Sequence, residues 1–341
     1  MSIKVPLEEL KFSLYQYADE MMMYESYYRD GKWDEGQIVP FHSIELSPAA
    51  NILNYGQGIF EGMKAYRSSA GKIVMFRPEE NARRFVRSTH KLAMPAVPEE
   101  KFLDAVRRVV LANEDFIPQD LTGRYSLYLR PVCVGIEPLL GVRASSEYLF
   151  YIFGSPVGPY FDKVGVVRLI VTDVHRAAPH GTGDSKAASN YAVTMLPKRE
   201  AQQQGFNDAL YLDAAHDKFI EEAGAANFFA LMEDGTLVTP EKGSILPGIT
   251  RKSIIRLARK TMGMKVEERP LGVEEVCHSA KECFVTGTAA VITSVSEISW
   301  KGTVFNVNNN GFRLAHRLYD KLVGIQLQRE EDPFGWVTEI K

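Results

Sequence analysis

Cysteine is scarce in this sequence, and recognisable metal-binding motifs are absent. The three cysteines, Cys133, Cys277 and Cys283, are scattered and odd in number. This argues against the disulfide framework of a small secreted protein and favours a reducing compartment. None of the seven histidines stands in an H-E-x-x-H, H-x-H or mixed cysteine–histidine ligand pattern. We therefore expect neither a structural disulfide nor a metal site.

Charge of one sign and long apolar runs are lacking as well. Lys and Arg number 40 against 43 Asp and Glu, and no basic stripe with interleaved aromatic residues is present, so we expect no nucleic-acid partner. The longest apolar runs, such as YLFYIFG, are far too short to span a bilayer, and the start MSIKVPLEELKF has no signal-peptide core. These absences predict a soluble, cytoplasmic protein without membrane contact.

The common nucleotide-binding and hydrolase motifs are missing too. GTGDSK and GIFEGMK lack the spacing of a Walker loop, and GQGIFEG is one residue too long for a dinucleotide fingerprint. The serine hydrolase motif G-x-S-x-G is also absent. The sequence therefore gives no support for a phosphate-loop enzyme, a dinucleotide-dependent enzyme or a serine hydrolase.

The length and composition indicate a two-domain globular protein. A chain of 341 residues exceeds one ordinary core, so two domains of about 150 residues each are expected. Apolar residues make up 45% and charged residues 24%, which is typical of soluble globular proteins. Residues 154–160 are rich in Gly and Pro and mark a candidate boundary. We place the domains at residues 1–157 and 158–341.

Hydrophobic periodicity predicts mixed strands and helices in both halves. Helical spacing is expected over residues 78–94, 98–116, 185–204, 248–263 and 310–328, and strands over 72–76, 125–135, 147–158 and 164–173. Residues 207–240 alternate like a meander, and residues 282–295 read as one buried strand interrupted at Gly287. The fold class is therefore α/β or α+β, which propensity alone does not separate.

One lysine stands in an unusual setting, in the stretch HGTGDSKAASNYA. Lys186 follows a glycine-rich turn, precedes a predicted helix, and is followed by the small residues Ala187, Ala188 and Ser189. A lysine forms a Schiff base with a carbonyl when a desolvated or cation-flanked pocket keeps it neutral. The small neighbours leave room beside its amine. Taken alone, the pattern also fits a solvated lysine in the first turn of a helix, which is the commoner case.

Two features suit the phosphate group of pyridoxal phosphate, a cofactor that binds through such a lysine. In LPGITRKS a glycine precedes a helix, so the backbone N–H groups of Ile249 and Thr250 are expected to point at an anion. Arg83 and Arg84 lie in a predicted helix. We expect their side chains to point in different directions, which allows one of them to bind a phosphate through two N–H donors. Each feature alone is also consistent with an ordinary helix.

A third feature suits the pyridine ring, whose nitrogen needs an acid to stay protonated and act as an electron sink. Glu221 and Glu222 stand at the edge of a predicted strand in FIEEAGAANFF. We expect one of them to face solvent and the other to turn inward. Two solvated glutamates are an equally good explanation of this pair on its own.

Together these segments resemble the branched-chain amino acid aminotransferases, within the class IV (fold type IV) pyridoxal-phosphate enzymes. Seven segments match family motifs in order: YGQGIFEGMKAYR, YLRPVCVGIEPLLGV, SPVGPYF, GTGDSKAASNY, EEAGAANFF, LPGITR and TGTAAVIT. The resemblance covers about residues 22–320. It implies a small N-terminal and a larger C-terminal domain with the cofactor between them. It also implies transfer of the amino group of L-leucine, L-isoleucine or L-valine to 2-oxoglutarate through a pyridoxal phosphate Schiff base.

The resemblance assigns cofactor binding to Arg84, Lys186, Tyr191, Glu222, Ile249, Thr250 and Thr288. It implies that Lys186 carries the Schiff base and then moves the Cα proton, so it is the catalytic residue. By the same resemblance Tyr191 forms a hydrogen bond with the phenolic oxygen of the cofactor. Glu222, in preference to Glu221, pairs with its pyridinium nitrogen. The other residues of the set bind the phosphate.

The resemblance also assigns the substrate pocket, to Tyr55, Phe60, Tyr128, Arg130, Leu140, Val142, Tyr160, Thr288 and Ala289. It implies that Tyr128 and the backbone N–H groups of Thr288 and Ala289 bind the substrate α-carboxylate. Arg130 and Tyr55 meet the side-chain carboxylate of glutamate. The apolar wall is completed by Leu140 and Val142 from a second subunit, so a homodimer is implied.

Two departures from the family and several alternatives remain at this level. Ala290 and Thr293 replace a C-x-x-C redox pair that some members carry, and Ala225 replaces a hydroxyl residue near the cofactor. D-amino-acid aminotransferase and aminodeoxychorismate lyase share the implied fold. A pyridoxal-phosphate-binding protein without turnover is a further alternative, which the intact set of Lys186, Tyr191 and Glu222 disfavours.

Overall fold

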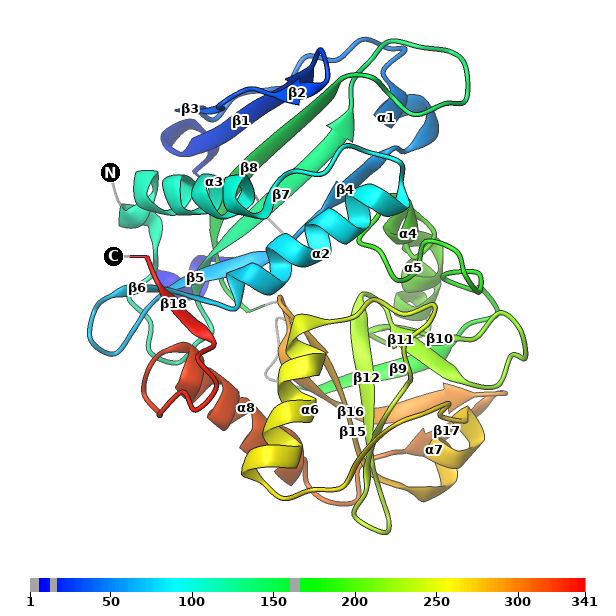
Figure 1. Cartoon of the computed structure of the whole chain (residues 1–341). Helices are drawn as coiled ribbons and strands as arrows, with labels where there is room; N and C mark the ends of the chain where they lie inside the picture. The colour runs from blue at the N-terminus through cyan, green and yellow to red at the C-terminus, as the bar shows by residue number, and fades with distance from the viewer. Residues whose placement is uncertain (1–5, 13–16, 160–165, 341) are drawn as a thin grey trace. The chain divides into compact units, whose positions relative to one another are not determined.

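The chain divides into two compact units in a computed structural model that describes residues 6–12, 17–159 and 166–340 (Figure 1). The first unit consists of Met1–Tyr160, Lys186–Ser189 and Val323–Lys341, and the second of Phe161–Ser185 and Asn190–Leu322. The short stretch with Lys186 thus belongs to the first unit, although its chain neighbours on both sides belong to the second. The boundary that we placed after residue 157 stays a prediction.

The first unit is built on an antiparallel sheet. Its strands are β1 (Met22–Arg29), β2 (Lys32–Trp33), β3 (Gln37–Pro40), β4 (Gly58–Phe60), β5 (Met63–Arg67), β6 (Ile73–Phe76), β7 (Ser126–Gly135), β8 (Tyr148–Val157) and β18 (Val337–Glu339). They follow the order β18-β6-β5-β7-β8-β1-β2, with β3 beside β1 and β4 beside β7. The strands predicted over 72–76, 125–135 and 147–158 are confirmed as β6, β7 and β8.

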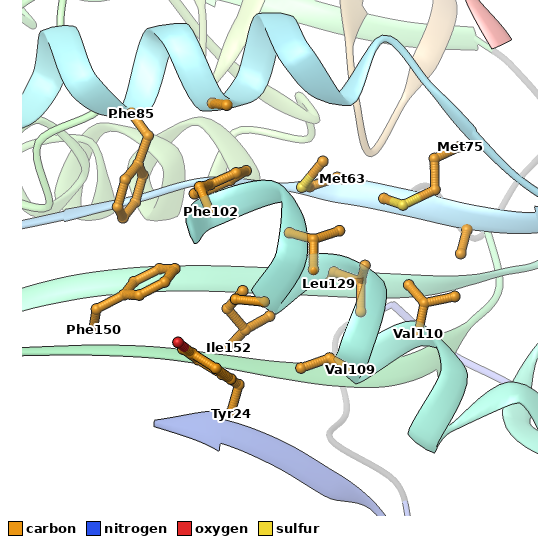
Figure 2. Close-up of a cluster of buried hydrophobic side chains, with 14 of the residues drawn as sticks. Tyr24, Met63, Met75, Phe85, Phe102, Val109, Val110, Leu129, Phe150 and Ile152 are labelled. Atoms are coloured by element: carbon orange, nitrogen blue, oxygen red, sulfur yellow. The ribbon is translucent and has the colours of Figure 1, made fainter. Parts of the chain in front are cut away.

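Two long helices, α2 (Pro78–Lys91) and α3 (Glu99–Ala112), bury their apolar sides against this sheet (Figure 2). The unit also contains α1 (Asn51–Tyr55) and the short 3-10 turns η1 (Leu7–Glu9), η2 (Ala18–Glu20) and η3 (Glu114–Phe116). Proline stands at or just before the start of α2 and α3, and acidic residues fill their first turns, which favours initiation at these positions. Both predicted helices are confirmed.

Aromatic rings join the helices to the sheet in this core. Phe85 of α2 and Phe102 of α3 have ring centroids 5.0 Å apart, and they lie 5.5 and 6.1 Å from Phe150 of β8 (Figure 2). The face predicted for α3, which consists of Phe102, Ala105, Val106 and Val109, is buried throughout. Tight packing of α2 against the sheet fixes the helix that carries Arg84.

The second unit contains a closed ring of strands. Its strands are β9 (Val166–Val171), β10 (Asp208–Leu212), β11 (Ile220–Ala223), β12 (Ala226–Met232), β13 (Leu237–Thr239), β14 (Val266–Glu268), β15 (Ala280–Gly287), β16 (Val291–Trp300) and β17 (Thr303–Asn306). The sheet runs β11-β10-β9-β16-β15-β12, and β11 pairs with β12 as well, which closes the ring. Closure leaves these six strands without an open edge.

The remaining helices are α4 (Ser189–Ala192), α5 (Met195–Gln203), α6 (Ile249–Thr261), α7 (Val273–Ser279) and α8 (Arg313–Gln326). The helices predicted over 248–263 and 310–328 are confirmed as α6 and α8, and the meander over 207–240 is confirmed as β10 to β13. No helix within the described ranges is long and apolar enough to cross a membrane.

Two predicted elements are wrong. The helix predicted over residues 185–204 begins only at Ser189 and is broken at residues 193–194 into α4 and α5. Before it, residues 186–188 bond to β4 through a bridge between Ala187 and Ile59. Tertiary pairing there overrides the helix propensity of the alanines. Residues 282–295 are not one interrupted strand but the hairpin β15–β16, which turns at residues 288–290. Val291 follows this turn with a φ of 56°.

Candidate active site

The backbone around Lys186 is fixed from two sides within the first unit. The Phe60 N–H donates to the Lys186 carbonyl at 3.1 Å, the Ala188 N–H donates to the Gly58 carbonyl at 2.9 Å, and Ala187 forms an antiparallel bridge with Ile59. The Lys186 N–H donates to Oγ of Ser88, on α2, at 3.0 Å. The lysine therefore precedes an isolated bridge to β4, and its position is set by β4 and α2.

The amine of Lys186 lies in surroundings that disfavour its charge. Nζ is 4.7 Å from the centroid of the Phe60 ring. Burial, followed by the nearby Arg84 guanidinium, lowers the pKa of Lys186 from 10.5 to about 8, although the Glu61 carboxylate acts in the opposite direction. At neutral pH about one amine in ten is then uncharged, far more than for an ordinary lysine. This is the state that a nucleophile or a base requires.

Arg84 is held by Glu61, a partner that we did not predict. Arg84 Nε and Nη2 donate to the two carboxylate oxygens of Glu61 at 2.6 and 2.8 Å. Asn81 Nδ2 adds a bond of 2.8 Å and the Gly62 N–H one of 3.2 Å. Glu61 is fully buried, and breaking such a pair leaves an uncompensated charge.

The charge of Glu61 is therefore maintained by its neighbours. Burial by itself acts to raise the pKa of Glu61, but the guanidinium of Arg84, with Lys186 and Asn81, outweighs it and the pKa is lowered. Because Nε and Nη2 of Arg84 face Glu61, a phosphate contact by Arg84 requires Nη1 or the second hydrogen of Nη2. The predicted phosphate role of Arg84 stays a prediction.

Three of the predicted substrate residues lie together beside Lys186. Arg130 Nη2 donates to the Tyr128 hydroxyl at 3.1 Å, and the Arg130 guanidinium lies 4.7 Å from the Phe60 ring centroid and 5.3 Å from that of Tyr128. Nε of Arg130 is buried and has no hydrogen-bond partner among the described residues. A buried N–H donor of this kind is well suited to a carboxylate ligand.

Gly62 leaves the space in which the Tyr128 hydroxyl lies. A Cβ atom at residue 62 would stand 2.1 Å from this oxygen. We therefore expect Gly62→Ala to displace Tyr128 and to raise the KM for L-leucine, a substrate that the resemblance implies, by about 10- to 100-fold. Gly243→Ala is the control, because no atom lies within 4 Å of its added Cβ. Steady-state kinetics of the two variants check the prediction, and an unchanged KM in Gly62→Ala would show that Tyr128 does not need this space.

A second lysine is buried on the same sheet. Lys64 of β5 pairs in register with Tyr128 of β7, and burial lowers its pKa from 10.5 to about 8. Burial of the charged form therefore lowers the free energy of unfolding by about 3 kcal/mol. This loss is fully present below pH 8 and disappears as the pH rises towards 10.5.

Removing this charge is expected to stabilise the protein. Lys64→Met should increase the free energy of unfolding at pH 7 by up to about 3 kcal/mol, and the gain should shrink between pH 8 and 10.5. Urea unfolding at several pH values measures it. A gain that did not depend on pH would trace to packing rather than to the charge.

The other predicted pocket residues of the first unit lie on its surface. The Tyr55 hydroxyl donates to the Leu140 carbonyl, while the side chains of Leu140 and Val142 are 82% and 87% exposed. Their contribution to a neighbouring subunit stays a prediction. Tyr160 lies outside the described residues.

In the second unit both candidate acids are buried. Glu221 is 6% and Glu222 3% exposed, so the expectation that one of them faces solvent is wrong. Glu222 pairs with the Arg176 guanidinium and accepts from Asn227 Nδ2 at 2.8 Å. Glu221 instead accepts from the Ser244 hydroxyl, and burial raises its pKa. Among the ion pairs of the described residues, the one with Arg176 is made by Glu222 and not by Glu221, and this favours Glu222 as the partner of a charged ring nitrogen.

The start of α6 suits an anion. Gly248 occupies its N-cap position, no described side chain caps it, and its first turn carries no acidic residue. This end of α6 is therefore the positive end of the helix dipole. The first N–H groups, including those of Ile249 and Thr250, point out of it, where an anion can bind.

The strand register brings the turn at residues 288–290 to the same end of the ring as Glu222. Glu222 opposes Asn227 on β12, and Asn227 opposes Thr286 on β15, two residues before Thr288. Thr288 and Ala289 form the turn and are half-buried. Tyr191 is also half-buried, on α4. The roles assigned to these three residues stay predictions.

Comparison with known proteins agrees with this arrangement. The sequence profile of the family Amino-transferase class IV matches residues 58–298. Branched-chain-amino-acid aminotransferase 5, chloroplastic, of Arabidopsis thaliana is 45% identical over 92% of this chain and 75% of its own length. The branched-chain-amino-acid aminotransferase of Helicobacter pylori is 43% identical over 92% of both chains.

Solved structures of similar proteins share the fold. The branched-chain aminotransferase of Thermoproteus uzoniensis with norvaline matches with a TM-score of 0.79 at 28% identity, covering 94% of this chain and 99% of that one. The branched-chain amino acid aminotransferase of Escherichia coli matches with a TM-score of 0.78 at 27% identity, covering 93% of this chain and 99% of that one. This chain therefore has fold type IV and belongs to the class IV aminotransferases, among the branched-chain-amino-acid aminotransferases.

Proposed function

We propose that this protein transfers the amino group of L-leucine, L-isoleucine or L-valine to 2-oxoglutarate, with pyridoxal 5'-phosphate as its cofactor. The observation that carries the proposal is the setting of Lys186, whose pKa is lowered to about 8 and whose backbone is fixed by β4 and α2. An enzyme of this family needs one amine in this state. The products are the branched-chain 2-oxo acids and L-glutamate.

The residues present fit pyridoxal phosphate. An aldehyde needs a reactive amine, a phosphate needs cationic and N–H donors, and a pyridine nitrogen needs an acid. Lys186, Arg84 with the start of α6, and the buried Glu222 supply these three chemistries. When bound, the cofactor accepts the electron pair that the substrate Cα–H bond leaves behind. We further propose that Tyr191 forms a hydrogen bond with the phenolic oxygen of the cofactor and that Thr288 forms one with its phosphate.

Lys186 then acts as the base for the Cα proton. An amine with a pKa near 8 takes up and returns a proton at neutral pH, because neither of its states is strongly disfavoured. The Phe60 ring, 4.7 Å from Nζ, covers the amine on one side and limits its hydration. Proton movement therefore stays between Lys186 and the substrate.

The residues around Arg130 are proposed to select the substrates. Nε of Arg130, which has no hydrogen-bond partner within the described ranges, would bind the second carboxylate of glutamate or 2-oxoglutarate together with Tyr55. The Phe60 ring offers apolar contact to a branched side chain, about 0.8 kcal/mol for each buried methylene. The α-carboxylate is assigned to Tyr128 and to the N–H groups of Thr288 and Ala289. One pocket thus has to serve both kinds of substrate.

We also propose a homodimer in the cytoplasm. Leu140 and Val142 are large apolar side chains with 82% and 87% exposure, which a neighbouring subunit would cover, and Tyr160 would extend the same apolar wall. Cys133, Cys277 and Cys283 are free and buried, as suits a reducing compartment.

Transfer of an isotope tests the function. The protein is incubated with ¹⁵N-labelled L-leucine, 2-oxoglutarate and pyridoxal phosphate, and the products are analysed by mass spectrometry. We expect ¹⁵N-glutamate and 4-methyl-2-oxopentanoate in equal amounts. A parallel incubation replaces the donor by ¹⁵N-labelled D-alanine. Label that reaches glutamate from D-alanine but not from L-leucine would assign the chain to the D-amino-acid enzymes instead.

A further inference from the structure

Asn227 contacts two segments that the proposed function assigns to different parts of one cofactor. Its Nδ2 donates to Oε1 of Glu222 at 2.8 Å and to the Leu246 carbonyl at 2.9 Å. Glu222 is the proposed partner of the pyridine nitrogen, and Leu246 stands two residues before Gly248, the N-cap residue of α6. The side chain is 4% exposed, so water does not compete with these bonds.

The chemistry of both contacts requires an amide at this position. A carboxylate oxygen and a backbone carbonyl are acceptors, so only the NH₂ group, which has two hydrogens, satisfies both. The opposite amide orientation would place Oδ1 against two acceptors. An aspartate of the same shape would lose both donors.

Asn227 also packs against the N-cap residue of α6. A Cβ atom at Gly248 would stand 2.0 Å from Asn227 Oδ1, so the glycine backbone packs directly on the amide. The backbone of Asn227 is fixed independently, because it opposes Glu222 on β11 and Thr286 on β15. The side chain therefore projects from a rigid strand and holds the loop that leads into α6.

We propose that Asn227 is a positioning residue that sets the start of α6 relative to the Glu222 carboxylate, so that one cofactor meets both. In pyridoxal phosphate a single ring carbon separates the nitrogen from the carbon that bears the phosphate arm. Its two binding groups consequently need a fixed spacing, which one short side chain can set. This inference rests on the proposed function.

The proposal predicts a joint loss of two affinities. Asn227→Ala should raise two Kd values of the full-length protein by about 10-fold or more each: that for pyridoxal, which has no phosphate, and that for inorganic phosphate. This is the size of effect expected when hydrogen bonds to charged or buried groups are lost. The Kd for pyridoxal phosphate should rise at least as much. Asn227→Asp, which keeps the volume, should behave alike and serves if Asn227→Ala does not fold.

Equilibrium dialysis of the cofactor-free full-length protein measures the three Kd values, well below the unfolding temperature. Asn310→Ala is the matched control, because Asn310 Nδ2 donates to Glu282 at 2.9 Å in the same unit but away from the proposed cofactor residues. This control should lower stability without changing any of the three affinities.

The outcomes separate this proposal from the function on which it rests. Wild-type protein that binds no pyridoxal phosphate would overturn the proposed function. Wild-type protein that binds it, with Asn227 variants that lose thermal stability but keep all three Kd values, would overturn only the role of Asn227. A higher Kd for pyridoxal alone, or for inorganic phosphate alone, would overturn the joint positioning. A higher Kd for both supports it.

Discussion

Replacing Lys186 by alanine is expected to lower kcat for the leucine reaction by at least about 10³-fold. The substitution removes the amine that both engages the cofactor and moves the Cα proton. The fold should survive, because the bonds that fix residue 186 come from its backbone N–H and carbonyl groups. Loss of a lysine whose pKa is lowered by burial should even raise the free energy of unfolding below pH 8.

Single-turnover kinetics and thermal unfolding of this variant check both parts. Lys72→Ala provides the control, since Lys72 is an exposed lysine of the same unit paired with Glu339, and it should retain full activity. If Lys186→Ala kept activity within 10-fold of the wild type, another residue would have to be the base.

Replacing Glu222 by glutamine is expected to lower kcat by about 10²- to 10³-fold. Glutamine keeps the shape but not the negative charge that would hold a proton on the pyridine nitrogen. It also leaves the Arg176 guanidinium, which now pairs with Glu222, without a counter-charge. We therefore expect a loss of unfolding free energy of about 3–5 kcal/mol as well.

The neighbouring acid supplies a matched control for this second prediction. Glu221 lies on the same strand with similar burial, but it bonds to Ser244. Glu221→Gln should therefore keep kcat close to the wild-type value. Equal losses in the two variants would mean that the strand as a whole, rather than the charge of Glu222, matters for turnover.

The elements that local sequence rules describe well were predictable. Helices α2, α3 and α6 have proline or glycine at their starts and a continuous apolar face. The non-helical stretch at Lys186 was not, because it depends on bonds to β4, more than 120 residues earlier in the chain. Local propensity contains no information on such a partner.

The partners of the site residues show the same limit. Lys186 stood out through its small neighbours, but the bonds of Glu61 to Arg84 span 23 positions and no local period reveals them. One signal for Glu61 was present, namely a glutamate within the otherwise apolar and glycine-rich GIFEGM. A buried acid there needs a cation. The bond from Asn227 to Leu246 depends on how the loop before α6 folds back, which the sequence does not specify.

The visible absorption spectrum shows whether Lys186 holds pyridoxal phosphate and whether the bound cofactor takes part in L-amino-acid transamination. Purified protein reconstituted with pyridoxal phosphate is titrated with D-alanine and then, in a separate sample, with L-leucine. We expect a yellow protein that L-leucine bleaches to the pyridoxamine phosphate form and that D-alanine leaves unchanged. A protein that takes up no cofactor, or one bleached by D-alanine alone, would contradict this expectation.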